Sequence, residues 1–348
     1  MTLLSSPSTA QDNNSGEAER MQKSAQDYMN RGDYPNAIMM YSQAIRQAPS
    51  DVSLRRDLAY TYYLSGDAKK AKEIIDPVMS SDVADELSYQ VSSGVEMALN
   101  NPGKARRILN DGITKFPYSG VLYNSKGNLL NKDKSSKDAL EAYQMGIKVE
   151  PTYPMNYYNA SKIYYQNNMA VWSLIYSEIY VNLDPTSKRT IEVKKMMMDA
   201  YRLLFTPDKN EALPTFNAKA GADAELKSFE DVFKKTMSES APAIADGLNT
   251  ENLIMLRTRF MLAWYKSFSI NYPMTLFTYQ NKMLHDGVYD AYNQWLFGAI
   301  DNSTEFTNWV KVNSKEYGNY ENWRKTNPLQ PASYDPVPNK NIKIKDKD

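Results

Sequence analysis

The chain has 348 residues with 41 basic and 41 acidic side chains, so its formal net charge is zero. It contains no cysteine and one histidine, His285, which excludes disulfides and thiolate chemistry and disfavours a zinc site. The balanced charge, without an evident basic patch, disfavours a nucleic-acid partner. No apolar run reaches the length of about 18 residues that a transmembrane helix needs.

The first 17 residues predict a disordered leader or the remnant of a signal peptide. The small residues Ser8, Thr9 and Ala10 resemble a signal-peptidase site, although the segment is short and has no positively charged start. A secretory signal would place the protein in the periplasm or elsewhere outside the cytoplasm. A leader of no importance would leave a cytoplasmic protein as the alternative.

Residues 18–51 predict two helices joined by a tight turn. Gly32 ends the first helix, Pro35 opens the second, and Pro49 stops it. Small and aromatic residues recur between these points at three- and four-residue steps, which places them on one face of each helix. They are Ala25, Tyr28, Ala37, Tyr41 and Ala44.

The same order of residues recurs along the chain and resembles the tetratricopeptide repeat (TPR), which has a period of 34 residues. The third unit departs from the pattern, because Glu96 stands where an aromatic residue belongs. The predicted units are 18–51, 52–85, 86–119, 120–153 and 154–187. The resemblance implies an all-α solenoid of about five helix–turn–helix repeats, in which the first helix of each unit lines a concave face.

The region after the repeats predicts a capping helix at 188–205. Ile191, Met196, Ala200 and Leu203 have helical spacing and predict its buried face. Further boundaries follow from loss of periodicity and from proline content. We expect a linker at 206–222, a second helical module at 223–327 and a disordered tail at 328–348.

The C-terminal module is rich in aromatic residues and resembles a region of TPR proteins of the Bacteroidetes, a resemblance that implies no activity. Its predicted helices are 224–238, 250–268, 273–286, 288–297 and 304–323. Phe260, Trp264 and Phe268 share one stripe, which favours a core, although a stacking platform for sugar rings is the alternative.

The sequence contains no constellation of residues that predicts catalysis, a metal or a cofactor. A nucleophilic triad needs a base, and His285, at the end of a predicted helix beside Asp286, is typical of a structural residue. No phosphate-binding glycine loop is present. We therefore predict a protein that is not an enzyme.

Polar side chains on the first helices of the fourth and fifth units predict a peptide-binding groove. Asn124 and Asn128 are four residues apart and share a helix face, and Tyr158, Asn159 and Lys162 take the equivalent surface of the next unit. Asparagine both donates and accepts hydrogen bonds, which suits an extended peptide. The alternative is ordinary solvated polar residues.

The leading hypothesis is a non-enzymatic scaffold that binds a protein or peptide in the concave TPR groove. The alternative is a glycan-binding accessory protein of the cell envelope that uses the C-terminal aromatics. An enzyme with an unrecognised site in the C-terminal module is a third, weaker hypothesis.

Overall fold

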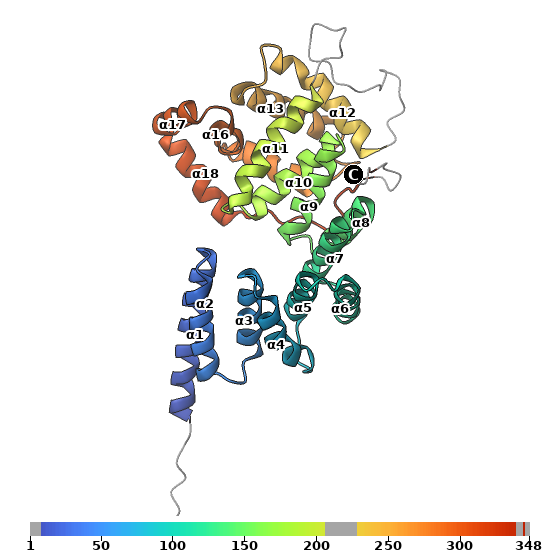
Figure 1. Cartoon of the computed structure of the whole chain (residues 1–348). Helices are drawn as coiled ribbons and strands as arrows, with labels where there is room; N and C mark the ends of the chain where they lie inside the picture. The colour runs from blue at the N-terminus through green and yellow to red at the C-terminus, as the bar shows by residue number, and fades with distance from the viewer. Residues whose placement is uncertain (1–7, 206–227, 339–343, 345–348) are drawn as a thin grey trace, which may run out of the picture. The chain divides into compact units, whose positions relative to one another are not determined.

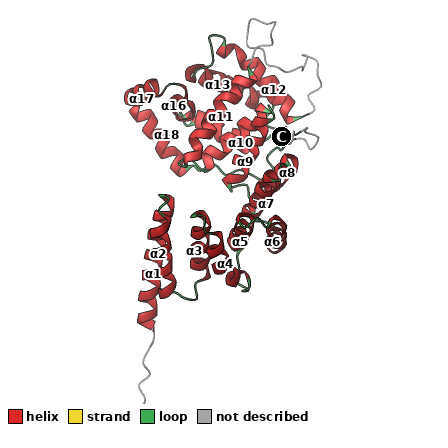
Figure 2. Ribbon diagram, in the orientation of Figure 1, coloured by secondary structure: helices red, strands yellow, loops and turns green. Residues whose placement is uncertain are grey.

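The computed structural model describes residues 8–205, 228–338 and 344, with side chains from residue 16 onward in those ranges. Helices dominate the fold, and no strand occurs within the described ranges (Figures 1 and 2). The predicted all-α class is therefore confirmed. The chain divides into two compact units, residues 1–133 and residues 134–348, and each is described by itself.

The first unit is a row of helical hairpins. Its helices are α1 (Ser8–Asn30), α2 (Tyr34–Gln47), α3 (Val52–Leu64), α4 (Ala68–Met79), α5 (Glu86–Ala98), α6 (Pro102–Lys115) and α7 (Gly120–Lys132). Helices α3, α5 and α7 pack against one another in chain order, with α4 and α6 packed beside them. The first helices of successive hairpins thus share one side of the row, as a solenoid requires.

The second unit continues the hairpins and adds the C-terminal module. Its hairpin helices are α8 (Ser136–Val149), α9 (Pro154–Gln166), α10 (Ala170–Leu183) and α11 (Lys188–Leu204). The module comprises α12 (Phe229–Ser240), the 3₁₀ turn η1 (Ala241–Ile244), α13 (Thr250–Ser267), α14 (Thr275–His285), α15 (Tyr289–Asn293), the π-helical turn η2 (Gln294–Gly298), α16 (Ala299–Asp301), α17 (Ser303–Val312) and α18 (Ser314–Thr326). The predicted helix 304–323 is divided, because α17 ends before Asn313.

Helix starts in the second to fifth hairpins, and that of α11, follow a 34-residue register. Helices α3, α5, α7, α9 and α11 begin at residues 52, 86, 120, 154 and 188, as the repeat boundaries predict. The hairpin turns carry a left-handed residue at the same register, Gly32, Gly66, Asn100, Lys134 and Asn168, with φ between 58° and 92°. Glycine adopts this conformation without strain and asparagine tolerates it, so the turn persists after the glycine is lost.

The first helix begins earlier than the sequence predicted. Helix α1 starts at Ser8, whereas the predicted repeat began at residue 18 after a disordered leader. Between Pro7 and the turn at Gly32 the only glycine is Gly16, and one such residue weakens a helix without stopping it. Residues 1–7 of the predicted leader lie outside the described residues.

The first unit has a core built from small residues and a few large ones. Ala25, Tyr41 and Ala44 are fully buried together where α1 and α2 meet. Glu96 on α5 is also buried and accepts contacts from Lys72 on α4 at 2.8 Å and Lys104 on α6 at 2.7 Å. This carboxylate therefore joins three helices through charge, where an aromatic residue would have joined them through packing.

The second unit is organised around α10. Every residue of that helix from Ala170 to Val181 is buried, because it is apolar on all sides and packs against α9, α11 and α12 (Figure 1). Trp172 packs against Phe229 of α12 at a ring separation of 5.4 Å. The C-terminal module therefore shares one core with the last hairpin.

A buried ion pair fastens this core. Arg257 of α13 donates to both carboxylate oxygens of Glu178 on α10, at 2.9 and 2.5 Å. Gln280 and Tyr292 donate to the same carboxylate at 2.6 and 2.7 Å, and Arg257 also donates to the Tyr201 hydroxyl at 2.8 Å. Burial disfavours the guanidinium, but the Glu178 carboxylate raises the pKa of Arg257 well above its usual value.

The core that α10 shares with the C-terminal module explains why the compact units do not follow the predicted domain boundaries. The sequence placed the end of the solenoid at residue 205, whereas the hairpins from residue 134 onward belong to the same compact unit as the C-terminal module. The predicted linker 206–222 lies outside the described residues.

Residues 328–338, which we call the strap, are ordered, although the sequence predicted a disordered tail from residue 328. Leu329 is only 2% exposed, and Pro331 and Pro338 are buried. Asp335 accepts hydrogen bonds from the backbone and hydroxyl of Thr275, both at 2.8 Å, and so caps α14, whose own N-cap residue has no suitable side chain. These contacts stabilise an extended, proline-rich segment that has no helix or strand of its own.

Candidate functional site

The candidate site lies between α9 and α11, the first helices of successive hairpins. Helix α10 follows α9 in the sequence and packs against both α9 and α11, so the chain returns and α11 contacts α9. Tyr158 on α9 and Glu192 on α11 are 34 residues apart and hold equivalent places on neighbouring helices. The register therefore brings their side chains together.

The side chains of Tyr158, Lys162 and Glu192 form a closed polar network. The Tyr158 hydroxyl donates to Glu192 Oε2 at 3.0 Å, and Lys162 Nζ donates to Glu192 Oε1 at 2.8 Å. Lys162 Nζ also lies 3.2 Å from the Tyr158 hydroxyl and 5.0 Å from the centre of its ring. The network fixes the position of the Lys162 ammonium at the edge of the site.

Electrostatics keep this network charged at neutral pH. Partial burial disfavours the Lys162 ammonium, but its interactions with Glu192 and Tyr158 together outweigh burial and raise the pKa of Lys162. The hydrogen bond from Lys162 likewise lowers the pKa of Glu192. The pair therefore behaves as a fixed element of the site rather than as a proton donor or acceptor.

Next to this network is a groove of about 630 Å³. Lys162 and Tyr165 of α9 line one side, and Lys188, Ile191 and Lys195 of α11 line the other. Ile191 is 58% exposed, whereas the neighbouring Met196 is buried beneath the groove. The groove thus offers an apolar contact between two exposed ammonium groups.

The structure brings only part of the predicted site together. Tyr158 and Lys162 belong to the network described above, and Asn159 is half-buried beside them without lining the groove. Asn124 and Asn128 lie on α7 in the first unit. The side-chain amide of Asn128 donates to the side-chain oxygen of Asn124 at 3.2 Å. Their predicted shared helix face is thus present.

The sequence analysis missed the contribution of α11. It assigned Ile191 to the buried face of a cap, whereas this side chain is exposed on the groove. Adding 34 to the position of Tyr158 gives Glu192, so the repeat register held the signal. The seven-residue spacing of Lys188 and Lys195 places both on that same face.

The described residues offer no candidate metal site, because no group of histidine and carboxylate side chains among them is suited to hold a metal ion. His285 is exposed, and its Nδ1 lies 2.8 Å from the Asn281 carbonyl oxygen of its own helix. Within the described ranges, no helix has both the length and the apolar character needed to cross a membrane.

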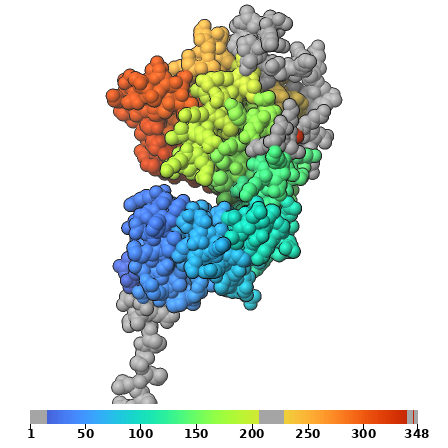
Figure 3. All heavy atoms as spheres, in the orientation of Figure 1, coloured from blue at the N-terminus to red at the C-terminus, as the bar shows by residue number. Residues whose placement is uncertain are grey.

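The three tryptophans that would carry a glycan-stacking platform differ in their exposure. Trp264 is buried. Trp295 lies between two cations, with Lys194 Nζ 3.5 Å and Arg324 5.6 Å from its ring centre. Trp309 is half-buried on α17, part of the orange-red lobe that projects from the second unit in Figure 3.

The hairpins and their register define the class of the protein as an α-solenoid. Residues 28–90 match the sequence model of the tetratricopeptide repeat family. The chain therefore carries tetratricopeptide repeats, and the family resemblance is confirmed.

The chain is also similar to proteins of known name. It is 25% identical to human protein O-mannosyl-transferase TMTC1 over 165 residues, which span 46% of this chain and 19% of the human protein. Among solved structures, *Pseudomonas aeruginosa* PilF is 14% identical, with a TM-score of 0.42 over 55% of this chain and 86% of that one. A tetratricopeptide repeat protein from *Parabacteroides merdae* is 14% identical, with a TM-score of 0.37 over 85% of this chain and 98% of that one.

Proposed function

We propose that the protein is a non-enzymatic scaffold that binds a protein or peptide segment in the groove between α9 and α11. Tetratricopeptide repeats generally mediate protein–protein interaction, which supports the general class. The observation that supports this particular site is the exposed Ile191 between Lys188 and Lys195 on the groove wall.

The chemistry of the groove favours a segment with an acidic residue beside an aliphatic one. Lys162 is already neutralised by Glu192, so Lys188 and Lys195 supply the attraction for a carboxylate. An exposed ion pair contributes only about 0.2–1 kcal/mol, whereas burying an isoleucine side chain contributes roughly 1.5–3 kcal/mol. Ile191 should therefore determine affinity, and the lysines should determine specificity and the rate of association.

A peptide library displayed on phage provides the test. Selection on the full chain, with counter-selection on a variant carrying Ile191→Asp, Lys188→Glu and Lys195→Glu, should enrich acidic–aliphatic segments. Fluorescence anisotropy should then show at least tenfold weaker binding of these peptides to Ile191→Asp. A variant with Lys311→Glu and Lys315→Glu, which changes exposed lysines outside the groove, is the control that matches the charge change of the two lysine substitutions. Peptides that bind all variants equally would refute the site.

Asn124 is only 3% exposed and cannot contact a partner, so exposed Asn128 alone remains a separate proposed contact of the first unit. Replacing Asn128 by alanine should weaken binding of a partner that uses that helix face, and Asn159→Ala serves the same purpose on α9. Unchanged binding in both variants would remove the asparagines from the site.

The alternative function as a glycan-binding protein loses its main support, because Trp264 is buried and Trp295 is covered by Lys194 and Arg324. Mannosyl transfer is not proposed, because the chain spans only 19% of the human TMTC1 protein. A location outside the cytoplasm stays a prediction from the first residues of the sequence.

A further inference from the structure

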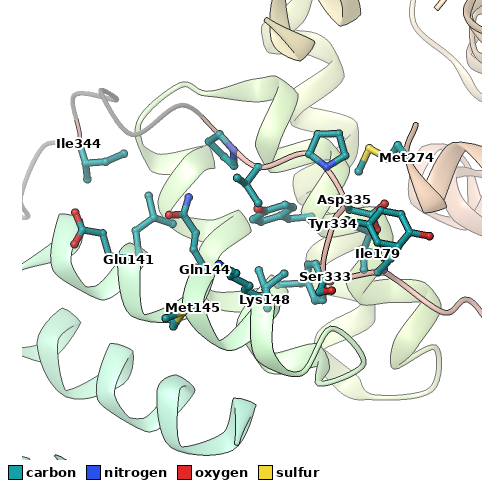
Figure 4. Close-up of a pocket in the computed structure, with 18 of the residues that line it drawn as sticks. Glu141, Gln144, Met145, Lys148, Ile179, Met274, Ser333, Tyr334, Asp335 and Ile344 are labelled. Carbon is teal, nitrogen blue, oxygen red and sulfur yellow. Dashed lines mark hydrogen bonds between the residues drawn. The ribbon is translucent and has the colours of Figure 1, made fainter. Parts of the chain in front are cut away.

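A second cavity of the second unit lies between α8 and the strap. It has a volume of about 680 Å³, within the range of roughly 300–1,000 Å³ that is usual for small-molecule sites. Figure 4 shows Glu141, Gln144 and Lys148 of α8 facing Ser333 and Asp335 of the strap across this space. The proposed peptide groove, which α9 and α11 form, does not include it.

The floor of the cavity is apolar and deeply buried. Leu140 and Ile147 of α8 and Ile179 of α10 are each 5% exposed or less, and Met274 closes the floor beside the strap. Pro336 of the strap adds to the opposite wall. An apolar body placed here would lose contact with water on several sides, which favours a small molecule over a peptide lying on an open surface.

One polar atom of the floor has no partner. Tyr176 is 2% exposed, and its hydroxyl forms no hydrogen bond with any described residue. A buried hydroxyl without a partner costs about 1–3 kcal/mol, so such groups usually face water or a ligand. The Asp335 carboxylate accepts from Thr275 and from the Ala332 backbone, and the Tyr176 hydroxyl does not donate to it.

The rim of the cavity carries two lysines and two carboxylates, so its formal charge is balanced. Lys137 and Lys148 are exposed on α8, with Glu141 between them, and within the described part of the chain neither lysine forms an ion pair. Asp335 is neutralised in part by its capping role at the N-terminus of α14. Because neither lysine forms an ion pair with a described residue, the ammonium groups of Lys137 and Lys148 can meet a carboxylate at the mouth of the apolar space.

We propose that this cavity binds a small amphipathic carboxylate. Its apolar body lies against Leu140, Ile147 and Ile179, its carboxylate reaches Lys137 or Lys148 at the rim, and a polar atom near the floor meets the Tyr176 hydroxyl. The strap supplies one wall, so the ligand also contacts the strap opposite α8.

Displacement of a fluorescent fatty acid tests this proposal on the full chain. The probe is 11-(dansylamino)undecanoate, and the competitors are dodecanoate, dodecanol and dodecylamine, which share a chain length and differ in charge. Dodecanoate should displace the probe at least tenfold more effectively than either other competitor. Equal potency of all three, or no binding of the probe, would overturn the proposal.

Variants separate this site from adventitious uptake of detergent-like molecules. Lys137→Glu with Lys148→Glu should weaken dodecanoate binding at least tenfold, and Tyr176→Phe should weaken probe binding several-fold. The charge-matched control, Lys311→Glu with Lys315→Glu, should bind both as the wild type does. Equal binding by the control and the two cavity variants would contradict the site. Peptide binding at Ile191 is measured independently, so failure of one site leaves the other testable.

Discussion

The two units of the protein follow one repeat register but are stabilised in different ways. In the first unit, small residues lie where the hairpins meet. The buried Glu96 carboxylate also forms ion pairs with Lys72 and Lys104, whose side chains are partly exposed. In the second unit α10 is buried on all sides, and its Glu178 pairs with Arg257 in a closed core. The comparison teaches that the same hairpin can act as an open repeat or as the centre of a globular core.

Removing the buried cation should produce the largest effect and confine it to the second unit. Arg257→Met leaves the Glu178 carboxylate buried without its cation, which typically costs about 3–5 kcal/mol. Denaturant unfolding combined with hydrogen exchange should show lost protection in α10, α13 and α14. Arg106→Met, which breaks the exposed pair with Asp133 in the first unit, is the control and should cost less than about 1 kcal/mol. Similar losses of stability in both variants would show that the buried ion pair matters no more for folding than the exposed one.

Acid should weaken the first unit through Glu96. Burial disfavours its carboxylate, but hydrogen bonds from Lys104, Lys72 and Asn101 lower the pKa of Glu96 to about 2 from an ordinary value of 4.5. The folded state therefore binds fewer protons, and the stability this group adds, on the order of 2 kcal/mol, is lost as pH falls from about 4.5 to 2. Thermal unfolding measured at several pH values in this range tests the expected loss of stability. Glu96→Gln should be less stable at neutral pH and lack this part of the pH dependence.

Alkaline pH should strengthen the second unit through Lys194. Burial, aided by Arg324, lowers the pKa of Lys194 to about 7, although its ammonium donates to the Trp295 carbonyl at 2.6 Å. Because the unfolded chain holds this proton up to a pH near 10.5, stability should rise by about 1 kcal/mol per pH unit between pH 7 and 9. Comparison with Lys194→Met, which lacks the titrating group, isolates the effect. Parallel pH profiles would show that Lys194 stays protonated in the folded protein.

Loss of the strap's cap should have the smallest effect on stability. Asp335→Ala removes the side-chain acceptor for Thr275 and should cost about 1 kcal/mol. Hydrogen exchange should increase at the start of α14 and leave the first unit unchanged. Asp335→Asn, which still accepts at an N-cap, should retain most of the protection. A strap that is released equally by both substitutions would show that charge, rather than capping, holds it.

The sequence predicted what is local and periodic. The repeat starts at 52, 86, 120, 154 and 188 follow from turn residues and apolar spacing, and the structure has helices beginning at each of them. The predominantly apolar character of residues 170–183 also held a signal of burial on all sides, although we did not use it.

Contacts between distant residues could not be predicted in the same way. Glu178 and Arg257 are 79 residues apart, and Thr275 and Asp335 are 60 residues apart, so no spacing rule joins them. Ile191 was misassigned because helical spacing gives the faces of a helix but not which face meets a neighbour. The candidate groove consequently depends on α11, whose exposed face the repeat register could have indicated but whose contacts with α9 required the structure.

Photo-crosslinking at Ile191 tests the central proposal, the partner groove between α9 and α11, most directly. A benzoylphenylalanine placed there in the full chain should form a discrete adduct with its partner in the cells that produce the protein. The same residue at Ile270, which is 93% exposed and outside the groove, is the matched control. We predict an adduct at Ile191 that is lost when Lys188 and Lys195 are both changed to glutamate. Equal adducts at both positions, or none at Ile191, would contradict the account.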